Sequence, residues 1–294
     1  MSVQPTCLWN AGAMLGEGVL WDAARQCIWF VDIKHRAIHR CAPDGSARRS
    51  WAAPGQVSFI VPSSDGGMVC ALDDGLYRFI EADGRFTPLV RVEADMPGNR
   101  FNDGHVDLHG RLWFGSMDDA EAAPSGALYR YDGASGRVER MDAGYVITNG
   151  PALGPDGRTL YHTDTLEKRI YAFELHADGV LSGKRLFTEI VDCGYPDGMA
   201  VDAEGCLWVA TFGGGRIDRF DAGGRKLGEV RFPCSNITKL AFGGADLRTV
   251  YVTSARKGLT HAELAAQPLA GALFTFRADT PVLPQHVLRL TGNP

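Results

Sequence analysis

A unit of about 44 residues recurs six times along this chain of 294 residues, and it constrains the fold more than any other feature. Each unit contains a short apolar strand with aromatic or β-branched residues, at residues 28–32, 68–71, 112–116, 160–164, 207–211 and 250–254. A second strand type follows each copy, at residues 37–40, 75–79, 127–131, 169–173, 216–220 and 272–276. Turn signals about ten to twelve residues apart give the chain an all-β rhythm.

A further strand precedes each of these pairs, and the residue at its head falls at the same phase of every repeat. The six heads are Glu17, Ser58, Asn102, Asn149, Asp197 and Thr238. Repeats of this length are typical of four-stranded blades. The sequence therefore predicts an all-β fold, a six-bladed β-propeller with four-stranded blades around a central channel, as one domain over residues 1–294. A pair of β-sandwiches is the alternative, and six in-phase copies disfavour it.

The last blade needs an additional strand to close the ring. Residues 6–9 and residues 287–290 are both candidates for this strand. Either segment would cover a sheet edge that is otherwise exposed.

Composition argues against several classes of partner and location. The net charge is −5 and there is no basic run, so nucleic acid is not expected to bind. We expect no membrane span, because no window of about 18 apolar residues occurs. The N-terminus lacks a basic segment followed by an apolar one, so no secretory signal is expected. Seven scattered cysteines without a CxxC pair predict free, mostly buried thiols and a cytoplasmic location.

The two faces of the predicted propeller differ in their loops. Turns between the first and second strands, and between the third and fourth, are short and carry Asp-Gly or a related pair, which leaves no room for a site. Loops on the opposite face are longer, the longest spanning residues 254–271. Because the innermost strands begin at this face, Glu17, Asn102, Asn149 and Asp197 are expected to meet at one mouth of the channel.

Two carboxylates and two amides at one mouth require an explanation. Unpaired carboxylates that lie close together repel, and burial raises their pKa. A divalent cation removes this conflict, because Glu17 and Asp197 supply two negative charges and Asn149 adds a neutral oxygen. Oxygen ligands favour Ca²⁺, Mg²⁺, Mn²⁺ or Fe²⁺ over a structural Zn²⁺, and three protein ligands leave positions open for water or substrate. The alternative is that these side chains cap strands and bind water.

Four short motifs resemble those of the SMP-30/gluconolactonase/regucalcin family. They are LGEG at residues 15–18, RFNDG at 100–104, TNG at 148–150 and PDGM at 196–199. The motifs occur in the order and spacing of the family, and the resemblance extends from residue 15 to the last blade. It implies a six-bladed propeller that binds one divalent metal ion in the channel, with Fe²⁺, Ca²⁺, Mn²⁺ and Zn²⁺ as candidates, and that hydrolyses sugar lactones.

The resemblance also implies roles for individual residues. Glu17, Asn149 and Asp197 would be the metal ligands, and Asp197 would also be the catalytic acid or base. Arg100 and Asn102 would bind substrate, which suits a polyhydroxylated ligand because Arg offers several donors and Asn offers both a donor and an acceptor.

Three further residues are candidates for substrate contact. Some family members use an acidic residue in the loop after the second strand of blade three, and the match here is shifted, so that Asp119 and Glu121 both remain open. Tyr145 lies on a connector that is expected at the same mouth. A packed aromatic side chain is the alternative for Tyr145.

The activity that the resemblance implies is hydrolysis of an aldonolactone to the open-chain aldonic acid. A pentonolactone such as xylonolactone is favoured over gluconolactone, because the chain resembles bacterial sugar-oxidation lactonases. Two alternatives stand beside this reading: a phosphotriesterase of the diisopropylfluorophosphatase kind, and a non-enzymatic metal-binding or scaffolding propeller. The sequence leaves the oligomeric state and the identity of the metal open.

Overall fold

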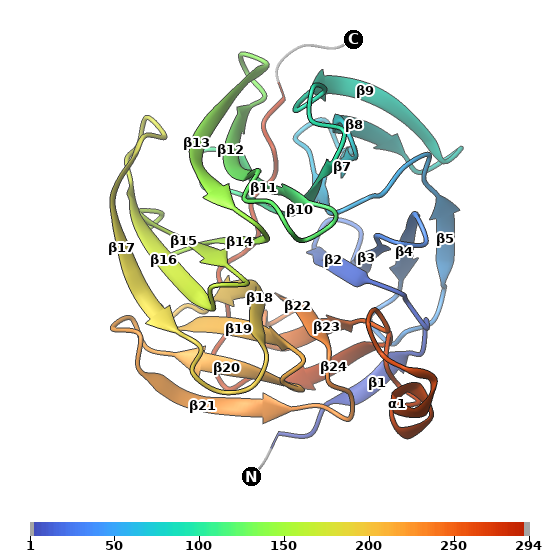
Figure 1. The fold of residues 1–294 in the computed structure, drawn as a ribbon. Helices are drawn as coiled ribbons and strands as arrows, with labels where there is room; N and C mark the ends of the chain where they lie inside the picture. Colours follow the sequence, from blue (N-terminus) through green and yellow to red (C-terminus); the bar gives the residue numbers. More distant parts are fainter. Residues whose placement is uncertain (1–2, 291–294) are drawn as a thin grey trace.

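The computed structural model describes residues 3–290, which form six four-stranded antiparallel sheets arranged as a ring around a central channel (Figure 1). This arrangement confirms the predicted six-bladed propeller. The innermost strands are β2 (Gly16–Asp22), β6 (Ile60–Pro62), β10 (Asn99–Val106), β14 (Thr148–Leu153), β18 (Tyr195–Val201) and β22 (Ile237–Gly243). The second strands are β3 (Cys27–Asp32), β7 (Met68–Leu72), β11 (Leu112–Asp118), β15 (Thr159–Asp164), β19 (Leu207–Phe212) and β23 (Thr249–Ser254).

The third and fourth strands complete each blade on its outer side. The third strands are β4 (Ala37–Cys41), β8 (Gly75–Ile80), β12 (Gly126–Asp132), β16 (Arg169–Leu175), β20 (Arg216–Phe220) and β24 (Leu273–Arg277). The outermost strands are β5 (Arg49–Ala52), β9 (Arg85–Arg91), β13 (Arg137–Tyr145), β17 (Leu181–Glu189), β21 (Lys226–Arg231) and, in blade six, β1 (Thr6–Trp9). Each second strand is almost fully buried, because a neighbouring blade covers each of its two faces.

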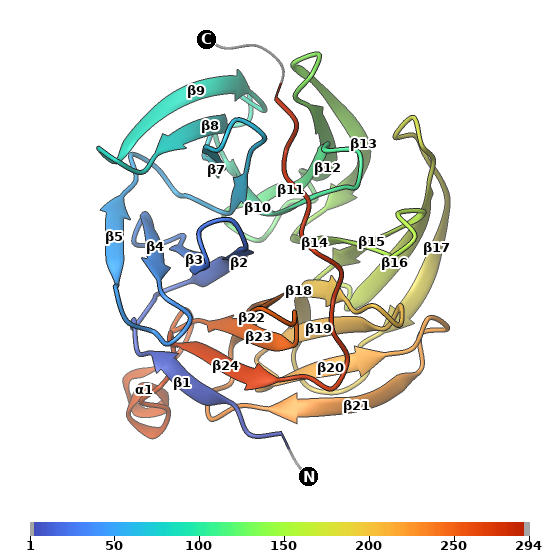
Figure 2. The same ribbon diagram turned by 180° about the vertical axis from the view of Figure 1, so that it is seen from behind.

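The ring is closed by the N-terminal segment, which is one of the two closing strands that the sequence offered. Strand β1 pairs antiparallel with β24, with Thr6 opposite Thr275 and Cys7 opposite Phe274. The C-terminal segment instead crosses the back of the propeller (Figure 2). Leu288 forms a parallel bridge with Ser63, and its backbone N–H donates to the carbonyl of Pro62 at 2.9 Å. The predicted contribution of residues 287–290 to blade six is therefore wrong.

A pairing between aspartate and tryptophan recurs in blades one, three and five. In each case the aspartate lies at or just after the end of the innermost strand, and it accepts a hydrogen bond from an indole N–H on the second strand. The pairs are Asp22–Trp29 at 3.3 Å, Asp107–Trp113 at 2.9 Å and Asp202–Trp208 at 2.8 Å. The same carboxylates accept backbone N–H groups of the following turn. One residue thus fixes the turn and anchors the largest side chain of the blade.

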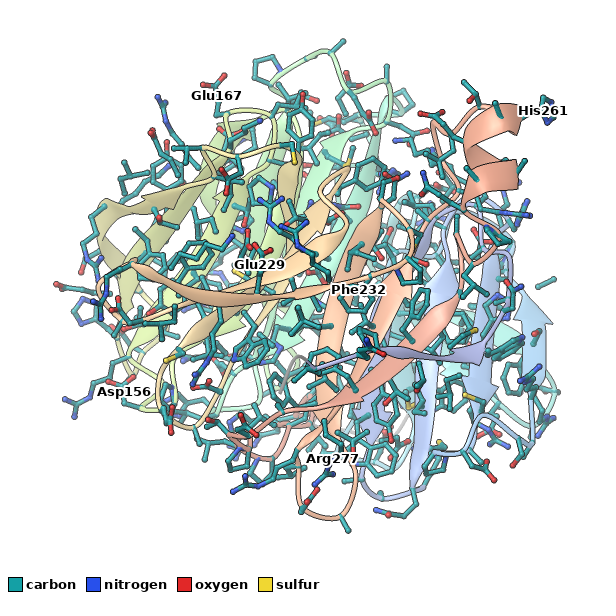
Figure 3. The ribbon with its side chains drawn as sticks, turned by 90° about the horizontal axis from the view of Figure 1, so that it is seen from below. Asp156, Glu167, Glu229, Phe232, His261 and Arg277 are labelled. Atoms are coloured by element: carbon teal, nitrogen blue, oxygen red, sulfur yellow. The ribbon has the colours of Figure 1, made fainter. Side chains whose placement is uncertain are left out.

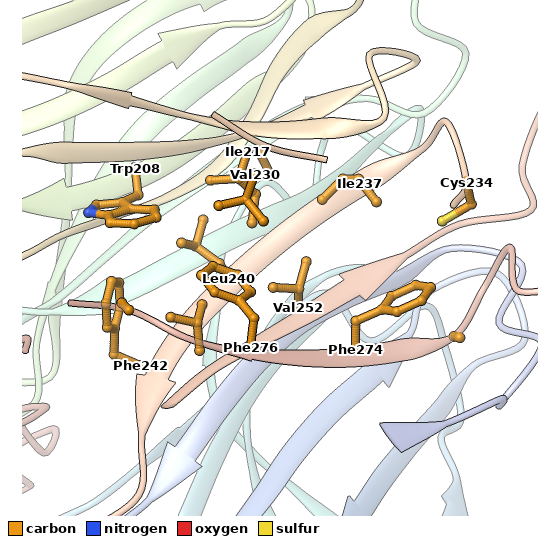
Figure 4. Close-up of a cluster of buried hydrophobic side chains, with 14 of the residues drawn as sticks. Trp208, Ile217, Val230, Cys234, Ile237, Leu240, Phe242, Val252, Phe274 and Phe276 are labelled. Carbon is orange, nitrogen blue, oxygen red and sulfur yellow. The ribbon is translucent and has the colours of Figure 1, made fainter. Parts of the chain in front are cut away.

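The core consists of apolar clusters between neighbouring blades. Figure 4 shows the cluster between blades five and six, where Trp208 packs edge-on against Phe242 with ring centroids 5.7 Å apart. Ile217, Val252 and Phe274 in the same cluster are fully buried. Burial of this kind stabilises by about 25 cal/mol for each Å² of apolar surface removed from water. Because each blade packs on two others, the positions of the innermost strands are fixed by the whole ring.

The two faces of the propeller differ as the loop lengths predict. Figure 3 shows Glu167 and His261 on one face, and Asp156 and Arg277 on the other. His261 begins the helix α1 (His261–Ala266), which lies in the long loop between β23 and β24 and was not predicted. The side chain of Thr260 caps this helix by accepting a hydrogen bond from the backbone N–H of Glu263. Within residues 3–290, no helix is long and apolar enough to cross a membrane.

Candidate metal and substrate site

The innermost strands share one irregularity near their heads. In five blades the pairing with the second strand shifts register, between Glu17 and Leu20, Phe101 and Gly104, Asn149 and Ala152, Pro196 and Met199, and Ile237 and Leu240. A bulge bends the strand and changes the direction of its side chains. The bulges therefore lie at the predicted polar positions of these five blades. As a result, the polar residues that repeat along the sequence form a ring around the channel.

Glycine follows several of the polar heads, and two of these glycines have a clear physical reason. Gly18, after Glu17, has a φ of +54°, which a residue without a side chain adopts most readily. Gly198, after Asp197, lies against the side chain of Lys239, and an added Cβ would stand 2.8 Å from its Cβ and Cγ. The glycine thus lets a lysine from the neighbouring blade pass beside Asp197.

Three carboxylates lie together in the channel, and all are almost completely buried: Glu17, Asp103 and Asp197. Burial, followed by the charge of Asp103, raises the pKa of Glu17 to about 8. Burial, and then the charges of Glu17 and Asp103, raise the pKa of Asp197 well above its ordinary value. Burial also raises the pKa of Asp103, although Lys239 opposes this effect. The three groups therefore repel one another in the absence of a cation.

The two amides form a hydrogen-bonded chain beside these carboxylates. Asn102 Nδ2 donates to Asn149 Oδ1 at 3.0 Å and to the carbonyl of Thr148 at 2.7 Å. Asn149 Nδ2 donates to Thr165 Oγ1 at 3.0 Å, and Thr165 donates in turn to the carbonyl of Pro196 at 2.9 Å. Because Thr165 holds the amide nitrogen, the oxygen of Asn149 faces Asn102. Thr165 was not recognised in the sequence, since it lies on a loop outside the repeated strand heads.

The charge of the cluster fits a divalent cation. Asp103 is paired with Lys239, whose Nζ lies 2.5 Å from both of its carboxylate oxygens. Glu17 accepts a hydrogen bond from the backbone N–H of Gly18 at 3.0 Å, and neither it nor Asp197 forms a salt bridge with a residue in the described part of the chain. Two buried carboxylates without a cationic partner, together with an amide oxygen, are hard oxygen ligands that suit a divalent ion.

Asp103 and Lys239 were absent from the predicted site. Both residues were nevertheless within reach of the sequence argument, because Asp103 follows Asn102 in the RFNDG motif and Lys239 follows the strand head Thr238. The repeat predicts only one polar strand head in each blade. The bulges allow a second residue to face the channel at the same level.

Arg100 and Asp119, two of the candidate substrate-binding residues, contact each other in the structure. Arg100 Nε lies 2.8 Å from Asp119 Oδ1, and Arg100 Nη1 donates to Asn102 Oδ1 at 2.7 Å. Lys34 Nζ also contacts Asp119 Oδ1, at 2.6 Å, and Gln56 bridges the two residues. Burial tends to raise the pKa of Asp119, but Lys34 and Arg100 outweigh it and hold that pKa below its usual range. Asp119 is thus the acidic residue of this loop that joins the channel cluster.

Glu121 and Tyr145 lie outside this network. Glu121 forms an ion pair with Lys257, on the loop after β23. The hydroxyl of Tyr145 donates to Asp142 and accepts from Lys184 on the outermost strand β17, while its ring packs edge-on against His162. Only 2% of Tyr145 is exposed, so the contacts favour the packed-aromatic alternative for this residue.

A second acidic group, at Asp202, Glu204 and Cys206, does not need a metal ion. Asp202 accepts hydrogen bonds from Trp208 and from both Nε and Nη2 of Arg219. Arg219 Nη2 also lies 2.7 Å from Glu204. These carboxylates are already neutralised by a guanidinium group, in contrast to Glu17 and Asp197.

Comparison with known proteins identifies the family. The model of the SMP-30/Gluconolactonase/LRE-like region matches residues 15–256. The chain belongs to this family. The match confirms the family predicted from the four motifs, and with it the predicted enzyme class, a sugar lactone hydrolase.

Relatives of this SMP-30/gluconolactonase chain cover nearly its whole length. A 6-deoxy-6-sulfogluconolactonase of Pseudomonas putida is 34% identical, with 94% of this chain and 95% of the relative aligned. An L-arabinolactonase of Azospirillum brasilense is 32% identical over 99% of this chain and 97% of its own length. Among solved structures, a calcium-binding regucalcin of Agrobacterium tumefaciens is 31% identical and superimposes with a TM-score of 0.94 over 99% of both chains.

Proposed function

We propose that this protein is a divalent-metal-dependent lactonase that hydrolyses aldonolactones to aldonic acids. The observation that carries the proposal is the pair of buried carboxylates, Glu17 and Asp197, which form no direct ion pair with any residue between 3 and 290 and lie in the same channel as Asn149. The calcium-binding relative and the two lactonases support the same reading.

In this proposal Glu17, Asn149 and Asp197 hold the metal ion, which supplies Lewis-acid polarisation of the lactone carbonyl when bound. Asp197 orients the attacking water and accepts its proton. Arg100 and Asn102 bind the hydroxyl groups of the sugar, and Asp119 keeps the Arg100 side chain in place. Asp197 then passes the proton from water to the ring oxygen as the C–O bond of the lactone breaks, and the open-chain acid releases a proton to solvent to give the aldonate.

The metal requirement is tested by removing and restoring the ion. Chelation is expected to reduce lactone hydrolysis to the spontaneous rate, and addition of Ca²⁺, Mn²⁺, Fe²⁺ or Zn²⁺ to separate samples is expected to restore it and to rank these ions. Proton release by a fixed amount of protein measures the rate, and metal content is determined on the same samples. Full activity in protein that contains no metal would refute the proposal.

We propose a pentonolactone, such as xylonolactone, as the preferred substrate over gluconolactone. The L-arabinolactonase relative supports this choice, because L-arabinolactone is also a pentonolactone. The sulfogluconolactonase relative supports the hexonolactone alternative. A panel of pentono- and hexonolactones, with an organophosphate triester included, ranks the substrates by kcat/KM. Higher kcat/KM for the triester would favour the phosphotriesterase alternative.

Two further properties belong to the proposal. Residues 1–294 form one lactonase domain, which is supported by the closure of the ring between β1 and β24. The protein works in the cytoplasm, which is supported by seven free cysteines, five of them buried.

A further inference from the structure

One ion pair of the channel has no role in the reaction as described so far. Lys239 Nζ lies 2.5 Å from each carboxylate oxygen of Asp103, and the backbone N–H of Gly104 donates to the same carboxylate at 2.7 Å. Only 6% of Lys239 and 1% of Asp103 are exposed. An ion pair this deeply buried costs free energy, because both charges lose their water. Its presence therefore calls for an explanation from its surroundings.

The pair joins opposite sides of the ring. Asp103 lies on β10 of blade three and Lys239 on β22 of blade six, and these blades face each other across the channel (Figure 1). The stem of Lys239 passes against Gly198, directly after Asp197. Lys239 also lines a cavity of about 440 Å³ that extends toward the C-terminal segment, where His286 lines it as well. Lys239 therefore extends from this cavity to the carboxylate of Asp103.

The net charge of the carboxylate cluster explains why a lysine lies at this position. Glu17, Asp103 and Asp197 interact electrostatically with one another, and together they carry three negative charges when ionised. Lys239 neutralises one of these charges, so that two remain. A divalent ion balances the remaining two. Without Lys239 the site would have three negative charges, and Asp103 would be a free carboxylate near the ion.

We propose that Lys239 is a positioning residue that keeps Asp103 out of the ligand set of the metal. The inference rests on the proposed function, because it concerns the same divalent ion. Lys239 sets the charge of the site to minus two and holds the carboxylate of Asp103 through contacts with both of its oxygens. Glu17, Asn149 and Asp197 then remain the ligands, and the side toward the mouth stays free for the lactone.

A cycle of four proteins tests the proposal: the parent, Lys239→Met, Asp103→Asn and the double variant. Mn²⁺ affinity of the metal-depleted proteins is measured by calorimetry. Each unit of charge close to the ion is expected to change the affinity by about tenfold or more. The expected order is Lys239→Met tightest, the parent and the double variant similar, and Asp103→Asn weakest. At saturating Mn²⁺, Lys239→Met is expected to hydrolyse the lactone about tenfold more slowly, with recovery in the double variant.

Control variants separate this role from a structural one. Lys226→Met breaks another ion pair with a buried carboxylate, since Lys226 Nζ lies 2.7 Å from Asp218, and it is expected to leave Mn²⁺ affinity unchanged. Lys239→Gln repeats the test if the methionine variant does not fold. Mn²⁺ affinity of Lys239→Met or Lys239→Gln that equals or falls below that of the parent overturns the inference. A parent that binds no divalent ion overturns the proposed function as well, so the two failures are distinguishable.

Discussion

Glu17 and Asp197 are similar in charge and burial, yet their positions suggest different tasks. Glu17 is tied to the backbone N–H of Gly18, which favours a fixed ligand. Asp197 also accepts a hydrogen bond from the backbone N–H of the residue after it, Gly198, but burial, and then the charges of both Glu17 and Asp103, raise its pKa well above its ordinary value. A group with these surroundings is suited to accept a proton from water, and this difference leads to the first residue-scale prediction.

Asp197→Asn preserves the shape of the side chain and one oxygen ligand but removes the proton acceptor. With the metal saturated, kcat is expected to fall by about 10² to 10⁴, because this is the usual contribution of a general base. The measurement is kcat with the metal content of each sample determined. A metal-loaded variant that remains within about threefold of the parent would leave Asp197 as a ligand only.

Arg100→Ala should affect the substrate and spare the metal. Arg100 contacts Asn102 and Asp119; within residues 3–290 no hydrogen bond or ion pair links it to Glu17 or Asn149, and its charge acts on Glu17 only as the last of several electrostatic influences. We expect kcat/KM to fall by roughly tenfold to a thousandfold, about 1.4 to 4 kcal/mol, with little change in metal affinity. Lactone kinetics and metal titration on one preparation test both parts. Loss of the metal from a folded variant would show instead that Arg100 supports the metal site.

At the scale of single elements, the aspartates that pair with tryptophans at the ends of the innermost strands are expected to contribute to the free energy of unfolding. Asp107 accepts hydrogen bonds from Arg111, at 2.6 Å, and from Trp113, and only 1% of its side chain is exposed. Asp107→Ala is expected to lower the free energy of unfolding by about 3–5 kcal/mol, because it leaves the buried guanidinium of Arg111 unpaired. Urea unfolding measures the loss.

The comparison for this prediction is Asp65→Ala in blade two. Asp65 occupies a similar turn and pairs with Arg78, but 37% of its side chain is exposed. Water can replace such a partner, so the expected loss is about 1 kcal/mol or less. Equal decreases in the free energy of unfolding for the two variants would show that burial does not make the Asp107 pair more stabilising than the exposed Asp65 pair.

The strands themselves were predictable, and the closing strand was not. The heads of the innermost strands and the aromatic residues in the second strands recur at fixed positions of each repeat. These positions were sufficient to predict the order of the blades. The choice between residues 6–9 and 287–290 depends on which segment reaches the edge of β24, and alternation of apolar residues does not contain that information. Helix α1 was missed for a related reason, since it is one short segment inside a long loop and has no counterpart in the other blades.

At the scale of the whole molecule, the buried carboxylates couple stability to pH and to the metal. The pKa of Glu17 is about 8 in the folded protein, against an ordinary value of 4.5. The folded state therefore keeps a proton that the unfolded chain releases, and stability from this group falls as pH rises from 4.5 to about 8. Burial lowers the pKa of His105 and His162 to about 3, and this works in the opposite sense up to pH 6.5.

The effect of the carboxylates is therefore expected to stand alone between about pH 6.5 and pH 8. The Tm of metal-free protein should fall across this window. The rise in Tm caused by Mn²⁺ should become larger, because fewer protons compete with the ion for the carboxylates as pH rises. Thermal unfolding at several pH values measures both trends. Glu17→Gln should weaken the fall, and a parent whose Tm rises steadily across the window would contradict the assignment.

The site was only partly predictable at this scale. Glu17, Asn149 and Asp197 share a phase with the repeat, so a closed ring must bring them together. Lys34, Gln56 and Lys239 reach the cluster through the length of their side chains and the shapes of individual loops, which differ between blades. Tyr145 shows the same limit: it was predicted on a connector, but it is the last residue of strand β13 and pairs with Gly126, and its hydroxyl accepts a hydrogen bond from Lys184 on β17.

The pairing of β1 with β24 has a consequence for the synthesis and folding of the protein. Thr6 and Thr275 are 269 positions apart, so β1 is synthesised long before the strand with which it pairs. Such distant pairing slows folding, and an unpaired edge invites wrong partners while it waits. The strands of the other five blades all lie between β1 and β22 in sequence, so they can pair before the sixth blade is completed by the contact between β1 and β24.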